Sequence, residues 1–233
     1  MSVIRLDKYV SVAMNISRTD AKKVIGNGKI TIDGICVKKT DFKVDAETMS
    51  VKNGNEELVY KEFIYILINK PSGLLSASTD KRAKTVIDII PPSLKREGLF
   101  PVGRLDKDTT GFLIITNDGD FAHRIISPKS NIEKLYYANL DGEVTPQMIL
   151  DFEKGVVLAD GTQCLPAKLE KEENNAALIT VREGKYHQVK RMFGTVGLGV
   201  NKLHRISIGG LSLPDFLEPG ECIELTPEEL EKI

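Results

Sequence analysis

The sequence predicts an α+β protein with a small N-terminal helix-helix-hairpin domain and a larger domain built on a mixed, mainly antiparallel β-sheet with flanking helices. Three observations predict this. Residues 1–45 show helical periodicity and then a hairpin signal. Residues 46–61 are polar and turn-rich, which indicates a linker, with part of the segment a candidate last strand of the N-terminal domain. From residue 62 to 233, β-prone runs are separated by turns, without the strand-helix-strand alternation of a parallel sheet.

The N-terminal domain is predicted element by element. Apolar residues recur at helical spacing over residues 6–14, which predicts a first helix. Ser17, with Asp20 three residues later, is a capping-box variant that begins a second helix, which ends at one of two nearby glycines. Asp33-Gly34 joins two short β-prone runs and favours a two-residue hairpin turn.

The larger domain shows strand signals that are rich in β-branched and aromatic residues. The four clearest runs are residues 63–68, 112–116, 136–140 and 177–181.

The composition excludes collagen-like and largely disordered proteins, since 41% of residues are hydrophobic and 28% are charged. The formal net charge is −1, but it is unevenly distributed. Residues 1–43 carry +5, residues 184–205 carry +5, and residues 215–233 carry −6. Near-neutrality is therefore an average over basic and acidic regions and does not exclude a nucleic-acid partner.

Several classes of site are missing from the sequence. No apolar run is long enough for a membrane helix, and no secretory signal or disulfide framework is visible, so we expect a cytoplasmic protein without membrane association. No phosphate-binding glycine motif, metal-ligand spacing or serine-hydrolase motif occurs. We therefore expect no cofactor and no metal. If the protein is an enzyme, it works with carboxylate, phenol and basic groups alone.

A charged turn between glycines, residues 103–111, runs into a strongly apolar strand. Such a turn can hold a carboxylate, that of Asp106, rigidly beside a buried sheet, with Arg104 close in sequence. A carboxylate fixed beside cations stays ionised and serves as nucleophile or base. The alternative interpretation is a salt-bridged surface turn, which composition alone favours.

Two further segments carry candidate binding residues. In residues 133–137, strand geometry places Lys134 and Tyr136 on one face, and an exposed tyrosine there stacks on a base. A cross-strand aromatic is the alternative. Residues 184–205 hold five basic residues, two histidines and no acid, which indicates a seat for phosphates. The alternative is a basic helix face balanced by acids elsewhere.

The N-terminal segment resembles the S4 RNA-binding domain. The resemblance rests on Arg5-Leu6-Asp7-Lys8, on Ser17-Arg18 at the start of the second helix, and on the hairpin of residues 28–37. It implies a small basic module that grips structured RNA through phosphates and shape. The RNA contacts that it implies are Arg5, Arg18, Lys22 and Lys23.

The three segments of the larger domain together resemble the pseudouridine synthase family that carries an N-terminal S4 domain. Gly-Arg-Leu-Asp from residue 103, with Thr-x-Gly and Thr-Asn-Asp-Gly after it, is similar to the first family signature. Lys-x-Tyr from residue 134 is similar to the second. Gly-x-Tyr-His-Gln-Val-Lys-Arg-Met from residue 184, with Leu-His-Arg and Ile-Gly-Gly after it, is similar to the third and is most like the small-subunit (16S) ribosomal RNA branch.

The resemblance implies roles for named residues. Asp106 becomes the catalytic aspartate, and Tyr136 becomes the ring that stacks on the target base and a candidate for removing its C5 proton. Lys190 takes the position of the basic residue that pairs with the aspartate. Wider relatives often have arginine there, and lysine is a point charge that cannot make a bidentate pair. Substrate or RNA contacts are implied or expected at Arg104, Lys134, His187, Arg191, Leu203 and Arg205. Of these, Arg104 and Arg205 are expected either to bind phosphate or to shape the site, and Leu203 to line the pocket.

The implied reaction is isomerisation of a specific uridine in ribosomal RNA to pseudouridine after the base has been flipped from its stack. Whether Asp106 attacks the base, attacks the sugar or abstracts a sugar proton stays open. The expected partner is ribosomal RNA or a pre-ribosomal particle, bound by a monomer. Two alternatives are the same chemistry on large-subunit (23S) RNA and a non-catalytic RNA-binding or ribosome-assembly protein.

Overall fold

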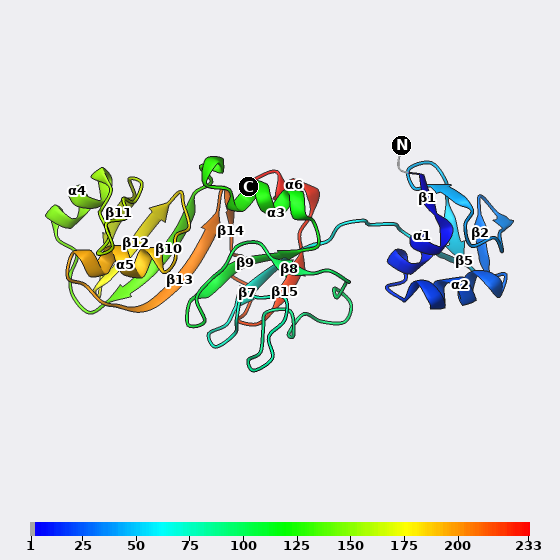
Figure 1. The fold of residues 1–233 in the computed structure, drawn as a ribbon, viewed down its shortest axis with the longest axis horizontal. Coiled ribbons are helices and arrows are strands. Elements are labelled where there is room, and N and C mark those ends of the chain that lie inside the picture. The colour runs from blue at the N-terminus through cyan, green and yellow to red at the C-terminus, as the bar shows by residue number, and fades with distance from the viewer. Residues whose placement is uncertain (1–2) are drawn as a thin grey trace. The chain divides into compact units, whose positions relative to one another are not determined.

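The computed structural model describes residues 3–233, which divide into a first compact unit ending at Phe63 and a second unit, Ile64–Ile233. Each unit has its own buried core. The predicted α+β fold is confirmed, with a small N-terminal unit and a larger unit built on a mixed sheet (Figure 1). Among residues 3–233, the longest helices are far too short to cross a membrane.

The first unit combines two helices with short strands. Its elements are β1 (Val3–Arg5), α1 (Leu6–Ala13), α2 (Arg18–Gly26), β2 (Ile30–Ile32), β3 (Ile35–Cys36), β4 (Lys43–Asp45), β5 (Val51–Asn53) and β6 (Glu56–Glu57).

The local signals for α2 and for the β2–β3 hairpin act as predicted. The Ser17 hydroxyl accepts a hydrogen bond from the backbone N–H of Asp20 at 3.1 Å, which caps the start of α2. The hairpin turns at Asp33 and Gly34, whose φ angles of 50° and 82° lie in the left-handed region. Asp-Gly favours this turn because aspartate tolerates positive φ and glycine adopts it freely.

The segment 46–61, predicted as a linker, is instead part of the first unit. β5 pairs with β2 and β6 pairs with β5, so the segment completes a four-stranded sheet. Its few apolar side chains are enough to anchor it, since Val51 and Leu58 are buried in the core. The polar composition reflects the exposed face of an edge hairpin, which composition alone does not distinguish from a linker.

A buried carboxylate in the first unit holds two of the predicted RNA-contacting arginines. The Asp7 side chain is only 2% exposed. It accepts hydrogen bonds from Arg5 Nε and Nη2 at 3.1 and 2.8 Å and from Arg18 Nη2 at 2.9 Å. These bonds, that from Arg5 foremost, hold the pKa of Asp7 well below its usual range despite burial.

Replacing Asp7 with asparagine is expected to destabilise the first unit by about 1–2 kcal/mol, because both arginine partners are half exposed and the loss is screened by solvent. A carboxyl with a lowered pKa stabilises above its unfolded pKa near 4 and loses that contribution as pH falls. The free energy of unfolding, measured with urea, should therefore fall more steeply with decreasing pH for the wild type than for Asp7→Asn. Asp41→Asn, which removes an exposed carboxylate 3.8 Å from Lys39, is the control and should leave stability unchanged. Equal stability of wild type and Asp7→Asn would contradict this.

The second unit is organised around one large sheet. Its strands are β7 (Tyr65–Lys70), β8 (Phe100–Pro101), β9 (Thr110–Thr116), β10 (Lys134–Leu140), β11 (Lys168–Glu172), β12 (Ala176–Val181), β13 (Val200–Ile208), β14 (Leu211–Ser212) and β15 (Cys222–Glu224). Its helices are α3 (Gly119–Ile126), the short 3₁₀ turn Pro128–Ser130, α4 (Pro146–Lys154), α5 (Gln188–Thr195) and α6 (Pro227–Leu230).

The sheet has the order β11-β12-β10-β13-β9-β7-β15, with β14 against β13 and β8 against β9. β13 pairs with β9 in parallel over only two residue pairs, whereas the neighbouring pairings β10–β13 and β7–β9 are antiparallel and longer. The short parallel junction therefore joins two antiparallel halves. Helices α4 and α5 contribute to the core beside β10–β12, and α3 contributes to the core beside β9 (Figure 1).

Candidate active site at the junction of the two half-sheets

Asp106 lies in the turn that leads into β9, and this turn is fixed from its buried side. The ammonium of Lys70, at the end of β7, is fully buried. It donates hydrogen bonds to the carbonyls of Pro71 (3.1 Å), Lys107 (3.2 Å) and Thr109 (2.8 Å). Since two of these carbonyls belong to the turn, Lys70 ties the Asp106 loop to the sheet.

Two cationic or ionisable side chains from the α5 region face the Asp106 carboxylate. His187 Nε2 lies 3.3 Å from Oδ1, and Lys190 Nζ lies 3.4 Å from Oδ2. Lys190 is closer to Asp108, with Nζ 2.6 Å from Oδ1, and this hydrogen bond lowers the pKa of Asp108. Lys190 is therefore shared between two carboxylates, as suits a point charge without the fork of an arginine.

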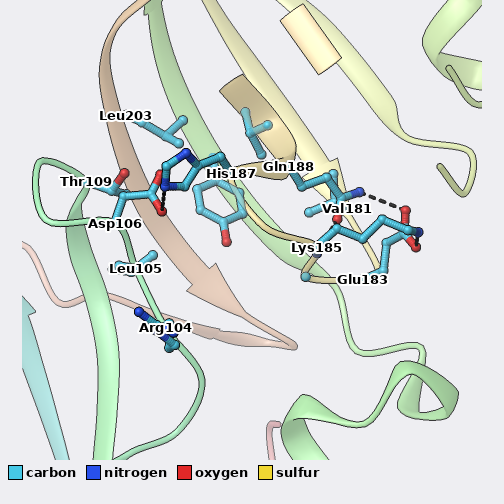
Figure 2. A pocket seen from close by; sticks show the side chains of 13 residues that line it. Arg104, Leu105, Asp106, Thr109, Val181, Glu183, Lys185, His187, Gln188 and Leu203 are labelled. Carbon is cyan, nitrogen blue, oxygen red and sulfur yellow. Dashed lines mark hydrogen bonds and ion pairs between the residues drawn. The ribbon is translucent and has the colours of Figure 1, made fainter. Parts of the chain in front are cut away.

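A pocket opens beside this carboxylate. Figure 2 shows His187 turned toward Asp106, with Thr109 and Leu203 beside them. Tyr136, from β10, lines the same pocket, and Glu183, Lys185 and Gln188 form a hydrogen-bonded group on its far side. The lining residues come from the Asp106 loop, from β10, β12 and β13, from the loop before α5 and from the start of α5.

Arg205 holds Tyr136, the tyrosine that lines this pocket, in its position. It lies opposite Tyr136 in the β10–β13 pairing and is only 4% exposed. Its Nε donates to the carbonyl of Phe112 at 2.8 Å, and its Nη1 lies 3.3 Å from the Tyr136 hydroxyl. The guanidinium carbon lies 5.8 Å from the ring centroid, a cation-π distance. Of the two expected roles, the structure supports site shaping, because a buried guanidinium does not reach a phosphate in solution.

The arrangement combines a partly exposed carboxylate with a flat aromatic ring and an apolar side chain. A carboxylate of this kind performs nucleophilic or proton-transfer chemistry. The ring of Tyr136 and the side chain of Leu203 offer contact surface to a planar, uncharged group. The site therefore suits a carboxylate that acts on a molecule whose planar, uncharged part rests on this surface.

Comparison with known proteins identifies the family. Residues 64–195 match the RNA pseudouridylate synthase family, and residues 4–50 match the S4 domain. The uncharacterized RNA pseudouridine synthase YtzG of Bacillus subtilis is 44% identical over 97% of both chains. The chain belongs to the pseudouridine synthase family. Ribosomal small subunit pseudouridine synthase A of Escherichia coli is 37% identical and covers 99% of this chain and 100% of its own. A crystal structure of a pseudouridylate synthase, at 35% identity, matches 98% of this chain with a TM-score of 0.68.

In this pseudouridine synthase, the other residues predicted to contact RNA differ in position: one lines the pocket, one lies outside it and one is buried. Arg104 is exposed and lines the pocket. Arg191 lies outside it, paired with Asp160. Lys134 is 8% exposed and donates to the Ile132 carbonyl at 2.8 Å, so its ammonium is bound within the protein and the RNA contact at Lys134 stays a prediction. Lys134 shares the face of Tyr136 as predicted, but that face is covered by the core at this end of the strand.

The four residues predicted to contact RNA in the S4 domain are at the surface. Arg5 and Arg18 remain 44% and 56% exposed although Asp7 holds them. Lys22 and Lys23 lie on α2, and Lys23 pairs with Asp20 at 2.8 Å.

Lys70 was not predicted from the sequence as a site residue. It ends an otherwise apolar strand, and a charge in that position usually marks the point where a strand reaches solvent. Its burial follows only from the return of the Asp106 loop onto the end of β7, a long-range contact without a local sequence signal.

Replacing Lys70 with methionine should lower kcat about 100-fold, because a loosened loop displaces Asp106 by a fraction of an ångström to one ångström. Burial lowers the Lys70 pKa to about 8, so wild-type kcat should fall as pH rises above that value, and Lys70→Met should lack this limb. Loss of stability does not account for such a fall, because a lysine with a lowered pKa favours folding increasingly as pH rises from 8 toward its ordinary 10.5. Lys154→Met, at an exposed lysine in α4, is the control. A wild-type kcat in Lys70→Met would contradict the role.

Proposed function

We propose that this enzyme converts a uridine of small-subunit (16S) ribosomal RNA to pseudouridine, with Asp106 as the catalytic carboxylate. The observation that carries the proposal is the position of Asp106, held 3.3 Å from His187 and 3.4 Å from Lys190 in a pocket that Tyr136 also lines. The 16S target is supported by the full-length similarity to proteins named ribosomal small subunit pseudouridine synthase A.

The reaction needs no external reactant. The N1–C1′ bond of the uridine breaks, the base turns, and a C5–C1′ bond forms while the C5 proton leaves and N1 gains a proton. In the proposal the flipped uracil lies against Tyr136 and Leu203, and Asp106 begins the reaction at the base or at the sugar. Arg205 keeps the Tyr136 ring in place while the base turns next to that ring.

The RNA around the target is held by basic residues in both units. We propose that Arg5, Arg18, Lys22 and Lys23 bind phosphates of structured RNA, while Arg104, His187 and Lys190 lie near the flipped nucleotide. The partner is then ribosomal RNA or a pre-ribosomal particle, and the protein acts as a single chain in the cytoplasm.

The test is to incubate the purified protein with protein-free 16S and 23S RNA, and with small-subunit assembly intermediates, from cells that lack the gene, and to map new pseudouridines. One new pseudouridine in 16S RNA is the expected result. A new site only in 23S RNA would contradict the proposed target and leave the chemistry intact. RNA binding without any new pseudouridine would contradict the proposed function.

A further inference from the structure

Tyr186 presents an aromatic ring to solvent at the edge of the candidate active site. Its side chain is 75% exposed, the largest exposure among the large hydrophobic side chains of the described residues. One face of the ring stacks on the imidazole of His187, with centroids 3.8 Å apart and planes inclined by 19°. His187 in turn lines the pocket and contacts Asp106, whereas Tyr186 does not line it.

The backbone holds this ring in place. His187 adopts a left-handed conformation with φ of 47°, which fixes the angle between the two consecutive side chains. The carbonyl of Tyr186 accepts a hydrogen bond from Arg191 Nη1 at 3.3 Å, and Arg191 is anchored by Asp160. One face of the ring is thus covered by His187, the backbone of Tyr186 is anchored by Arg191, and the other face of the ring is open to solvent.

An open aromatic face in this setting suits a nucleic-acid base better than a protein partner. Of the basic residues in the segment 184–205, Lys185, Lys190 and Arg191 are paired with carboxylates and Arg205 is buried, so excess positive charge does not define the setting. What defines it is the adjacent pocket, which takes an RNA nucleotide under the proposed function, and His187 joins the ring to that pocket. Unpaired bases stack on aromatic side chains with little dependence on sequence, and each stacked base strengthens binding about tenfold.

We propose that the open face of Tyr186 stacks on a nucleotide next to the target uridine. The inference rests on the proposed function, because His187 then separates two bases: the flipped uridine in the pocket and its neighbour on Tyr186. The consequence for the substrate is that two consecutive nucleotides must be unpaired or easily unstacked. A uridine inside a stable helix is then a poor substrate even if its own base is flipped.

The test is a double-mutant cycle on dissociation constants. The probe is a fluorescent RNA oligonucleotide around the mapped uridine, intact or with an abasic residue on its 5′ or 3′ side. Tyr186→Ala should weaken binding of the intact RNA about tenfold, Tyr186→Leu similarly, and Tyr186→Phe less than twofold. An abasic neighbour should weaken wild-type binding by a similar factor and add nothing in Tyr186→Ala. Tyr137→Ala, which removes a 39% exposed tyrosine from β10, is the matched control and should bind like the wild type.

Coupling with either the 5′ or the 3′ neighbour supports the proposal and identifies the stacked nucleotide. The proposal would be overturned if Tyr186→Ala bound the intact RNA as the wild type does. It would also be overturned if the effects of Tyr186→Ala and of the abasic neighbour on the free energy of binding were additive. The cycle measures binding and not product, so its failure is separate from failure of the proposed function. If no uridine is modified, the same cycle on an oligoadenylate with a single central uridine tests the stacking alone.

Discussion

Gly111→Ala should destabilise the second unit by about 3–5 kcal/mol, the sum of backbone strain and overpacking. Gly111 has a φ of +100°, which side-chain-bearing residues rarely adopt, and an added Cβ would lie 2.3 Å from the Arg205 carbonyl oxygen. The methyl group would therefore push β9 away from β13 at their short parallel junction. Because Asp106 precedes β9 and Tyr136 lies on β10 beyond β13, any folded variant should also lose most of its activity.

Urea unfolding of the full chain, followed by circular dichroism, measures this effect. Gly119→Ala is the matched control: Gly119 begins α3, has no positive φ, and an added Cβ meets nothing within 4 Å. That variant should unfold at the wild-type urea concentration or slightly above it. Wild-type stability for Gly111→Ala would mean that the junction between the half-sheets is looser than described.

Asp106→Asn should lower kcat by roughly a thousandfold or more while the dissociation constant for RNA changes little. Asparagine keeps the volume and an oxygen that faces His187, but it is neither a nucleophile nor a base at neutral pH. Lys190 retains Asp108 as an ion-pair partner at 2.6 Å, so the pocket keeps its shape.

Asp108→Asn is the matched control for this prediction. It removes a carboxylate of the same turn that is 71% exposed and leaves Lys190 with Asp106 alone. Turnover should stay within about tenfold of the wild type, since Asp108 faces solvent and does not line the pocket. A loss as large as that of Asp106→Asn would mean that the two aspartates act together.

The fold followed from local signals where these were strong. The Ser17 cap and the Asp33-Gly34 turn are decided by hydrogen bonds and φ angles within a few residues, so sequence reasoning placed them correctly. The segment 46–61 was predicted mainly as a linker, with one candidate strand, because a short edge hairpin has the same polar composition as a linker. Its two buried core residues, Val51 and Leu58, are too few to produce a periodic pattern.

The candidate site likewise has residues that sequence motifs identified and features that only the packing of distant segments determines. The motifs pointed to Asp106, Tyr136 and Leu203, which the structure brings to one pocket. What the sequence did not reveal depends on packing between distant segments: the burial of Lys70 and Lys134, and the sharing of Lys190 between two aspartates. Each of these is set by how one strand or loop returns onto another, which a linear pattern does not encode.

The most direct measurement of the central claim is tritium release from RNA labelled at C5 of uridine, because formation of pseudouridine removes that hydrogen. The assay uses enzyme in excess over RNA, so that affinity and product release do not limit the signal. The wild type and Asp108→Asn should release tritium in proportion to the target uridine. Asp106→Asn should bind the same RNA and release none over the same period. Release by Asp106→Asn at the wild-type rate would contradict the assignment of Asp106 as the catalytic carboxylate.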